Sequence, residues 1–239
     1  MKSNINLSRR KAIVYGAGLL GTGSLVAWLE KPTLADNSTA INNEDRKLPL
    51  TPDQALKKLM AGNDRFVENK RNYPDQDSKR LKEIAQGQNP FVAILGCADS
   101  RVPSEIIFDQ GLGDIFNVRV AGNISTIEDV ASEEYAVAVL NTPLLMVLGH
   151  QKCGAVDAAI KGGNPPGMIG SLVFAISPAV KASEGLPGDR LTNAIVANIK
   201  LQVSRLKASS LISNAIKEGK LKIVGAYYHL DSGKVSLID

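Results

Sequence analysis

Two uninterrupted hydrophobic runs stand out in the pattern of the chain. They span residues 91–95 and 144–148, and neither alternates with polar positions. A strand that is apolar at every position has both faces covered, so these runs predict buried strands of a parallel sheet. Residues 115–120 and 223–228 predict two further strands, and residues 235–238 predict a short last strand after a turn.

Apolar residues at helical spacing lie before and between the predicted strands. A helix is expected to begin at Thr51, because threonine can cap it, proline follows at the first helical position and Gln54 can complete a capping box. Residues 127–140 and 190–218 also show helical periodicity. Strands that alternate with helices predict an α/β fold, with a mostly parallel central sheet flanked by helices on both faces.

The N-terminal segment differs from the rest of the chain. Arg9 and Arg10 stand before an uncharged, glycine-rich stretch at residues 12–29, and small residues that suit a cleavage site end at Ala35. This pattern resembles a twin-arginine export signal. We expect an export signal at 1–35, a polar linker at 36–50 and one domain at 51–239. The domain is then periplasmic or otherwise extracytoplasmic, with membrane contact only through an uncleaved signal.

The distribution of charge argues against a nucleic-acid partner. Residues 1–35 contain five basic residues and one acidic residue, which accounts for the whole net charge of +4. The remaining chain is balanced and has no basic excess for binding phosphates. The glycine pattern at 16–21 matches a dinucleotide-binding fingerprint, but no second strand follows it, so we reject a nucleotide site.

Metal-ligating residues are few and follow the two buried strands. The chain has two cysteines and two histidines; Cys97 follows the first strand, and His150 and Cys153 follow the second. Ligands of open α/β sheets bind at the carboxyl ends of the strands. Two thiolates and one imidazole suit zinc and leave a fourth position open, as catalytic zinc sites do. A disulfide between the cysteines, or two unrelated core thiols, are the alternatives.

Polar residues directly beside Cys97 could serve such a metal. Asp99 lies two residues after the cysteine, where a carboxylate can hydrogen-bond the fourth ligand of the metal. Arg101 could orient that carboxylate and keep it ionised. The alternative is an ordinary surface ion pair at the end of a strand.

These motifs resemble the paired signature of β-class carbonic anhydrases. Residues 97–101 read CADSR and residues 149–154 read GHQKCG, and the similarity extends over about residues 51–239, including the RVAGN segment at 119–123. The resemblance implies a β-carbonic anhydrase-like fold and the zinc-dependent, reversible hydration of carbon dioxide to bicarbonate and a proton. It also implies a homodimer or a higher homo-oligomer.

The resemblance assigns roles to individual residues. It implies Cys97, His150 and Cys153 as zinc ligands, and Asp99 with Arg101 as the catalytic pair. In some members of the family the matching aspartate binds the metal in a resting state, so Asp99 is also a possible fourth ligand. Such members often have a tryptophan where this chain has Ile94, although Arg119 and Tyr228 match other residues of their bicarbonate pocket.

Two other functions are compatible with parts of this pattern. One is hydrolysis of carbon disulfide or carbonyl sulfide by a relative on the same scaffold, which would keep the same ligands. The other is a non-catalytic redox or disulfide protein. The second histidine, His229, is expected to be structural rather than a ligand, with a role in proton transfer as its alternative.

Overall fold

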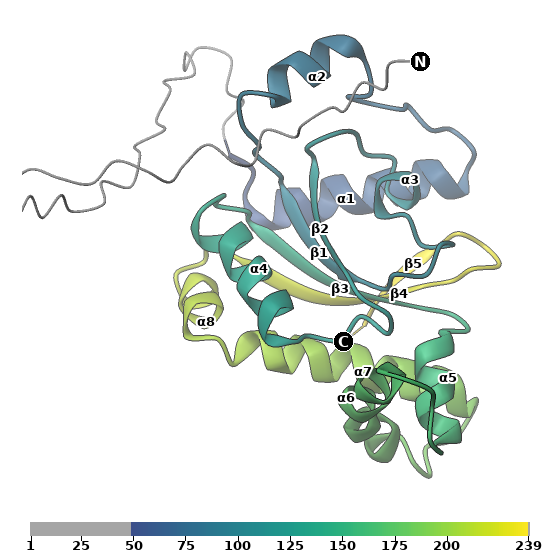
Figure 1. Cartoon of the computed structure of the whole chain (residues 1–239). Helices are drawn as coiled ribbons and strands as arrows, with labels where there is room; N and C mark the ends of the chain where they lie inside the picture. Colours follow the sequence, from purple (N-terminus) through teal and green to yellow (C-terminus); the bar gives the residue numbers. More distant parts are fainter. Residues whose placement is uncertain (1–48, 239) are drawn as a thin grey trace, which may run out of the picture. The chain divides into compact units, whose positions relative to one another are not determined.

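A five-stranded sheet forms the centre of the protein (Figure 1). The structure is a computed structural model that describes residues 49–238. The strands are β1 (Val92–Gly96), β2 (Ile115–Arg119), β3 (Leu144–His150), β4 (Lys222–Tyr228) and β5 (Val235–Ile238). They lie in the order β2-β1-β3-β4-β5, and all pairs are parallel except the antiparallel pair of β4 and β5. The mostly parallel sheet is therefore confirmed.

Helices cover both faces of this sheet (Figure 1). The helices are α1 (Pro52–Val67), α2 (Ser78–Ile84), α3 (Ser104–Ile107), α4 (Ile127–Ala138), α5 (Gly154–Lys161), α6 (Ile169–Ala182), α7 (Arg190–Lys207) and α8 (Ser210–Lys217). Helices α1 and α3 pack on one face, while α4 to α8 lie on the other, so the flanking helices are confirmed as well.

The two hydrophobic cores explain why the central strands are apolar at every position. Successive side chains of a strand point to opposite faces of a sheet. In β3, Leu144, Met146 and Leu148 enter the core beneath α1 and α3. Leu145 and Val147 enter the core formed with the helices of the other face. Both sets are fully buried, so the run at 144–148 offers no position for a solvent-exposed polar side chain.

Helix α7 packs very closely on the middle of the sheet. A Cβ atom added at Gly149 would lie 2.7 Å from two atoms of Ile199, and one added at Gly225 would lie 2.7 Å from a third. A side chain at either of these positions of β3 and β4 would clash with Ile199, so that this side chain or the helix would have to shift. This close packing fixes the position of α7, which contributes to the surroundings of the site described below.

The first helix begins as its sequence predicts, and the helical stretch after residue 190 is divided into two helices. The Thr51 hydroxyl accepts from the Gln54 amide at 3.3 Å, and the Gln54 side chain accepts from the Thr51 amide at 2.8 Å, completing the capping box. The stretch at 190–218 is helical, as its periodicity predicts, but the chain turns after Lys207 and Ser209 caps a separate helix, α8. Helices α2 and α3 were not predicted.

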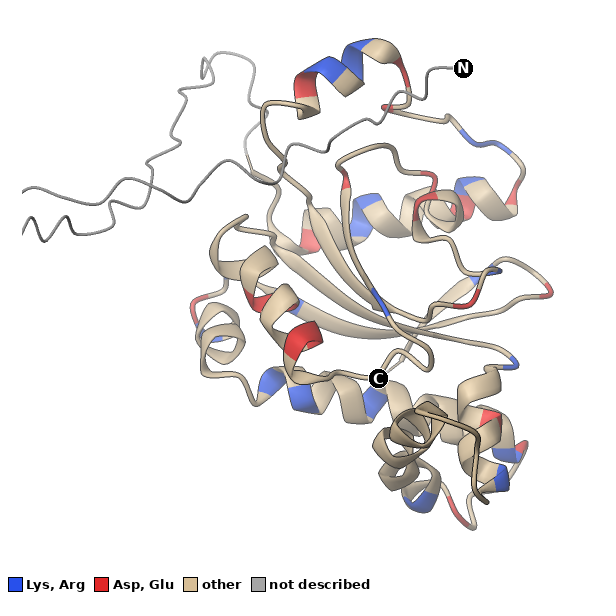
Figure 2. Cartoon of the chain, viewed as in Figure 1, with Lys and Arg blue, Asp and Glu red and all other residues tan. Residues whose placement is uncertain are grey.

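Charged side chains are distributed over the elements of the domain. Figure 2 shows acidic residues on α4 and basic residues on α7, while α1 and α2 carry both signs. No helix within residues 49–238 is long and apolar enough to cross a membrane. The export signal expected at 1–35, and nearly all of the linker expected at 36–50, lie outside the described residues.

Candidate active site

The candidate site lies at the carboxyl ends of β1 and β3, which are neighbours in the sheet. After β1 the chain crosses to β2 on one side, and after β3 it crosses to β4 on the other side. The carboxyl ends of two such strands form a crevice that commonly binds ligands in α/β proteins. Cys97 follows β1 directly, His150 is the last residue of β3, and Cys153 precedes α5.

The structure brings the three expected metal ligands together. The ligand atoms of Cys97, His150 and Cys153 all lie within 4.8 Å of one another, and all three residues are buried. Both cysteines are free thiols, so the geometry favours the metal site over the disulfide. Two sulfur atoms and one nitrogen at this separation match the donors that zinc prefers.

The orientation of the His150 ring provides an independent test of this fit. Its Nδ1 atom lies 3.0 Å from the backbone oxygen of Gln151. Since a carbonyl can only accept, Nδ1 carries the proton and Nε2 presents its lone pair. Nε2 is fully buried and has no hydrogen-bond partner among residues 49–238. A buried acceptor beside two thiols is satisfied by a metal ion, so the donor set fits zinc.

The two thiols influence each other's ionisation. A hydrogen bond from Cys153 is the largest cause that lowers the pKa of Cys97, and a bond from the Gly122 amide acts in the same direction. The same bond raises the pKa of Cys153, and burial adds to this effect. The pair therefore holds one thiolate readily, and a bound cation favours the second, because thiolates are the forms that bind metals.

Asp99 and Arg101 form an ion pair with two side-chain hydrogen bonds next to the ligands. The Arg101 Nε atom donates to Asp99 Oδ1 at 2.9 Å, and Nη2 donates to Oδ2 at 2.7 Å. The Arg101 backbone amide adds a third bond at 2.9 Å. The Arg101 side-chain bond is the main reason why the pKa of Asp99 lies well below its usual range. Asp99 Oδ2 is 3.9 Å from His150 Nε2, so this carboxylate adjoins the ligand cluster.

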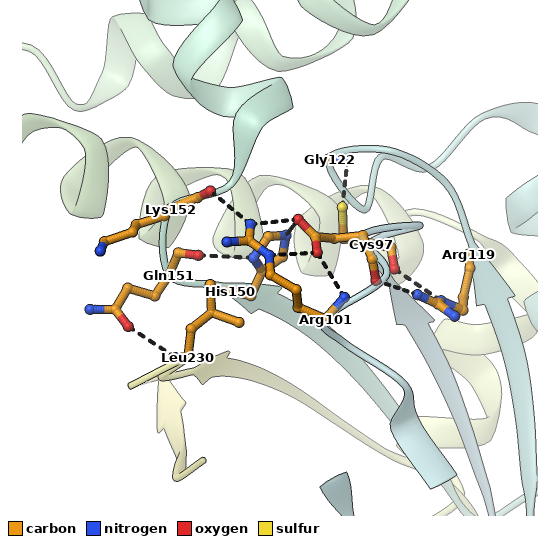
Figure 3. A network of polar contacts seen from close by, with 9 residues as sticks. Cys97, Arg101, Arg119, Gly122, His150, Gln151, Lys152 and Leu230 are labelled. Atoms are coloured by element: carbon orange, nitrogen blue, oxygen red, sulfur yellow. Dashed lines mark hydrogen bonds and ion pairs between the residues drawn. The ribbon is translucent and has the colours of Figure 1, made fainter. Parts of the chain in front are cut away.

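Neighbouring residues hold the segment that carries this pair. Arg119, at the end of β2, donates to the backbone oxygens of Cys97 at 3.0 Å and of Asp99 at 2.7 Å. The Arg101 guanidinium also reaches the Lys152 carbonyl at 3.5 Å (Figure 3). These contacts join the segments after β1 and β3. The sequence predicted neither bond of Arg119, because nothing in its spacing showed which backbone atoms it would meet.

Further polar contacts of the site were not predicted from the sequence. The Gly122 amide donates to Cys97 Sγ at 3.3 Å. The Gln151 side chain accepts from the Leu230 amide at 2.9 Å and donates to Asp231 Oδ2 at 3.0 Å, which ties the site to the turn after β4. For the bond from Gly122 to Cys97, the only indication in the sequence was the glycine of the RVAGN segment.

His229 lies apart from the ligand cluster. Its Nε2 atom is 3.3 Å from Ser236 Oγ, and its ring contacts Tyr227 edge to face at 4.8 Å between centroids. The cluster includes His150 and not His229, as expected for a structural histidine. Ile94 is fully buried in the core beneath α1, on the face of β1 opposite Leu95.

Comparison with known proteins agrees with the fold and the site. A family model described as carbonic anhydrase matches residues 92–235. Carbonic anhydrase 2 of Mycobacterium tuberculosis is 44% identical over 193 residues, which cover 79% of this chain and 93% of that protein. A carbonic anhydrase of Mycolicibacterium smegmatis is 38% identical over 191 residues, covering 78% of this chain and 93% of that protein.

Solved structures show the same architecture. A tetrameric β-carbonic anhydrase of Sordaria macrospora superposes with a TM-score of 0.62 at 25% identity, covering 66% of this chain and 85% of that one. The Coccomyxa β-carbonic anhydrase, solved with acetazolamide, gives 0.61 at 26% identity, covering 68% and 78%. A parallel sheet with a Cys-His-Cys cluster at its carboxyl edge thus defines a β-class zinc enzyme.

The chain belongs to the carbonic anhydrase family, and its fold places it in the β class. It is a zinc enzyme that catalyses the reversible hydration of carbon dioxide to bicarbonate. The curated relatives favour this activity over hydrolysis of carbon disulfide or carbonyl sulfide. The free thiols and the relatives together disfavour a non-catalytic disulfide protein.

Proposed function

We propose that Cys97, His150 and Cys153 hold the zinc of this enzyme and that Asp99, oriented by Arg101, is its catalytic carboxylate. The observation that carries the ligand assignment is the buried Nε2 of His150, which lies beside two buried thiols and has no hydrogen-bond partner in the described part of the chain. Zinc bound there supplies Lewis-acid activation of the water that adds to carbon dioxide. The protein contributes the orientation of the reacting groups and control of the proton.

Asp99 is suited to act as a fixed hydrogen-bond acceptor. Three donors from Arg101 hold its two oxygens, and they keep it ionised because they favour the charged form. An ionised carboxylate only accepts, so a water or hydroxyl group beside it must point its hydrogen at Asp99. Its oxygen lone pair is then directed away from Asp99 and is free to attack carbon dioxide.

The alternative role of Asp99 as a resting-state ligand requires a different conformation. Here the carboxylate is engaged by Arg101, and within residues 49–238 the cluster of ligand atoms that lie within 4.8 Å of one another comprises only the two cysteines and His150. Binding of Asp99 to the metal would require at least part of this ion pair to break. The present arrangement therefore supports the catalytic role.

The ligand assignment is tested by metal analysis of single variants. Cys153→Ser and His150→Gln should each lose most of the zinc and nearly all carbon dioxide hydration activity, because three protein ligands are required. His229→Gln is the matched control, since it removes the second histidine outside the cluster, and it should keep about one zinc per chain. A fully active, zinc-free Cys153→Ser protein would falsify the assignment.

We also propose that the enzyme is exported in the folded state. The support is the Arg9-Arg10 pair before an uncharged stretch, with the net charge of the chain confined to the first 35 residues. Zinc loading is coupled to folding, because the fold assembles the ligands. An unfolded chain crossing into an oxidising compartment would expose two thiols, whereas a folded chain protects them. The mature domain would then begin after Ala35.

Assembly into a homo-oligomer is a further part of this proposal. Ile127 of α4, Phe174 of α6 and Met168 beside α6 are at least 80% exposed, which is unusual for large apolar side chains. The Sordaria relatives form tetramers. Sedimentation equilibrium of the purified enzyme should therefore give at least twice the mass of one chain, and a monomer mass would contradict this part.

A further inference from the structure

The loop between β2 and α4 brings its backbone into contact with a proposed zinc ligand. Gly122 in this loop donates its amide to Cys97 Sγ at 3.3 Å. The glycine has φ of +77°, and a Cβ atom there would lie 2.6 Å from Ile176. A side chain here would strain the backbone and crowd Ile176, so glycine favours this close approach of the loop to the sulfur.

Helix α7 holds the same loop at two points. Asn198 Nδ2 donates to the Gly122 carbonyl at 2.8 Å, so it binds the same residue whose amide contacts the sulfur. One turn later, Gln202 Oε1 accepts from the Ser125 amide at 3.0 Å and from its hydroxyl at 2.8 Å. Gln202 Nε2 donates to Asn198 Oδ1 at 2.8 Å, which joins the two side chains. Both are at most 1% exposed.

The backbone groups at the two ends of this chain of bonds determine its direction. The Gly122 carbonyl can only accept, so Asn198 must present its NH₂ group there and its oxygen to Gln202. Gln202 must then donate to Asn198 and use its own oxygen for the Ser125 amide. Each position therefore requires one donor and one acceptor, which an amide provides and an ionised carboxylate does not.

We propose that Asn198 and Gln202 are positioning residues of the zinc site, acting through the Gly122 amide on Cys97. This inference rests on the proposed role of Cys97 as a ligand. An N–H group aimed at a metal-bound thiolate fixes the direction of the sulfur and withdraws electron density from it. Outer partners of this kind orient the ligands and tune the metal. Neither amide needs to touch the metal or the substrate.

Asn198→Asp in the full chain is the principal test. Its shape is almost unchanged, but at an alkaline pH, where the aspartate is ionised, it places an acceptor against the Gly122 carbonyl and repels the loop. We expect zinc affinity, measured by competition with a chelator, to fall about 10- to 100-fold. With cobalt(II) in place of zinc, the thiolate-to-cobalt charge-transfer band should shift in energy, because the hydrogen bond to sulfur is weakened.

Asn193→Asp on the same helix is the matched control. Asn193 Nδ2 donates to the carbonyls of Leu186 at 3.3 Å and Pro187 at 3.1 Å, in the turn between α6 and α7. This variant makes the same chemical change and also disturbs a helix–loop contact. It should leave the cobalt band and the zinc affinity as in the parent, which separates a general effect on α7 from positioning of the ligand.

Gln202→Glu provides a second variant if Asn198→Asp does not fold. It retains an acceptor for Ser125 but loses the donor to Asn198, so we expect a smaller band shift in the same direction. The inference is overturned if a folded Asn198→Asp protein keeps the parental cobalt band and zinc affinity. If only Gln202→Glu folds, the same result in that variant overturns it. A parent without any thiolate-to-cobalt band contradicts the proposed ligand set itself, and the inference with it.

Discussion

The buried carboxyl group of Glu133 is expected to make a pH-dependent contribution to the stability of this enzyme. Glu133 lies on the face of α4 that packs into the core, between Val130 and Val137. It is fully buried, and neither carboxylate oxygen has a hydrogen-bond partner among residues 49–238. Burial, with a smaller contribution from the negative charge of Asp129, raises the pKa of Glu133 to about 8.

The sign and size of the effect follow from this shift. A pKa raised from 4.5 to about 8 means that folding favours the protonated form. The folded protein then binds more protons than the unfolded chain, so stability falls as pH rises from about 4.5 to about 8. At about 1.4 kcal/mol per pKa unit, the cost is about 1 kcal/mol at pH 5 and about 3 kcal/mol at pH 7.

Glu133→Gln removes the titration while it keeps the shape of the side chain. The free energy of unfolding, measured in urea at one protein concentration, should favour the variant over the parent by about 2 kcal/mol more at pH 7 than at pH 5. Glu134→Gln is the neighbouring control, because the Glu134 carboxylate accepts from Ser209 Oγ at 2.5 Å instead of being unpartnered. Its difference from the parent should change much less between these pH values.

The change in the free-energy difference between pH 5 and pH 7 tests the prediction better than the difference measured at either pH alone. The buried glutamine amide adds its own cost, but that cost does not titrate, so it cancels between pH 5 and pH 7. A difference between the Glu133→Gln variant and the parent that stays constant over this range would refute the reasoning. It would mean that the carboxylate finds a partner or water in solution.

The remaining predictions concern catalysis and export. Asp99→Asn and Arg101→Ala should each retain zinc yet lose hydration activity about 100-fold or more. The first variant removes the anionic acceptor, and the second releases it from its fixed position. If both variants keep near-parental turnover at neutral pH, the pair is only a surface ion pair. Replacement of Arg9 and Arg10 by lysine should leave a full-length, zinc-loaded, active enzyme in the cytoplasmic fraction. If this variant is exported as well as the parent, the twin-arginine signal is excluded. If the parent remains at full length in the membrane fraction, cleavage after Ala35 is excluded.

Several structural features follow from local patterns that the sequence shows directly. The apolar runs of β1 and β3 have no polar position, so each had to be covered on both faces wherever it lay. The capping box at Thr51 depends on residues three positions apart. Cys97, His150 and Cys153 were recognisable because they are scarce residue types at the ends of buried strands. Parallel strands bring those ends to one edge of the sheet.

Other features depend on contacts between residues far apart in the chain, which local patterns do not contain. The helical period of the sequence continues past Lys207, but the helix ends before α8. At this break the Ser209 hydroxyl donates a hydrogen bond to the Glu134 carboxylate of α4. The spacing on α4 places Glu133 on an apolar face, yet only packing decides that no donor from residues 49–238 reaches its carboxylate.

The hydrogen bonds around the zinc ligands show the same division. Cys97 and Asn198 are about a hundred positions apart, and the Gly122 loop that connects them is fixed by close packing against Ile176. The sequence by itself determined the strands, the ligand types and the class of chemistry, because these depend on residue identity and short spacing. Only the tertiary structure decided which distant donors and acceptors meet, because hydrogen bonds require positions accurate to a fraction of an ångström.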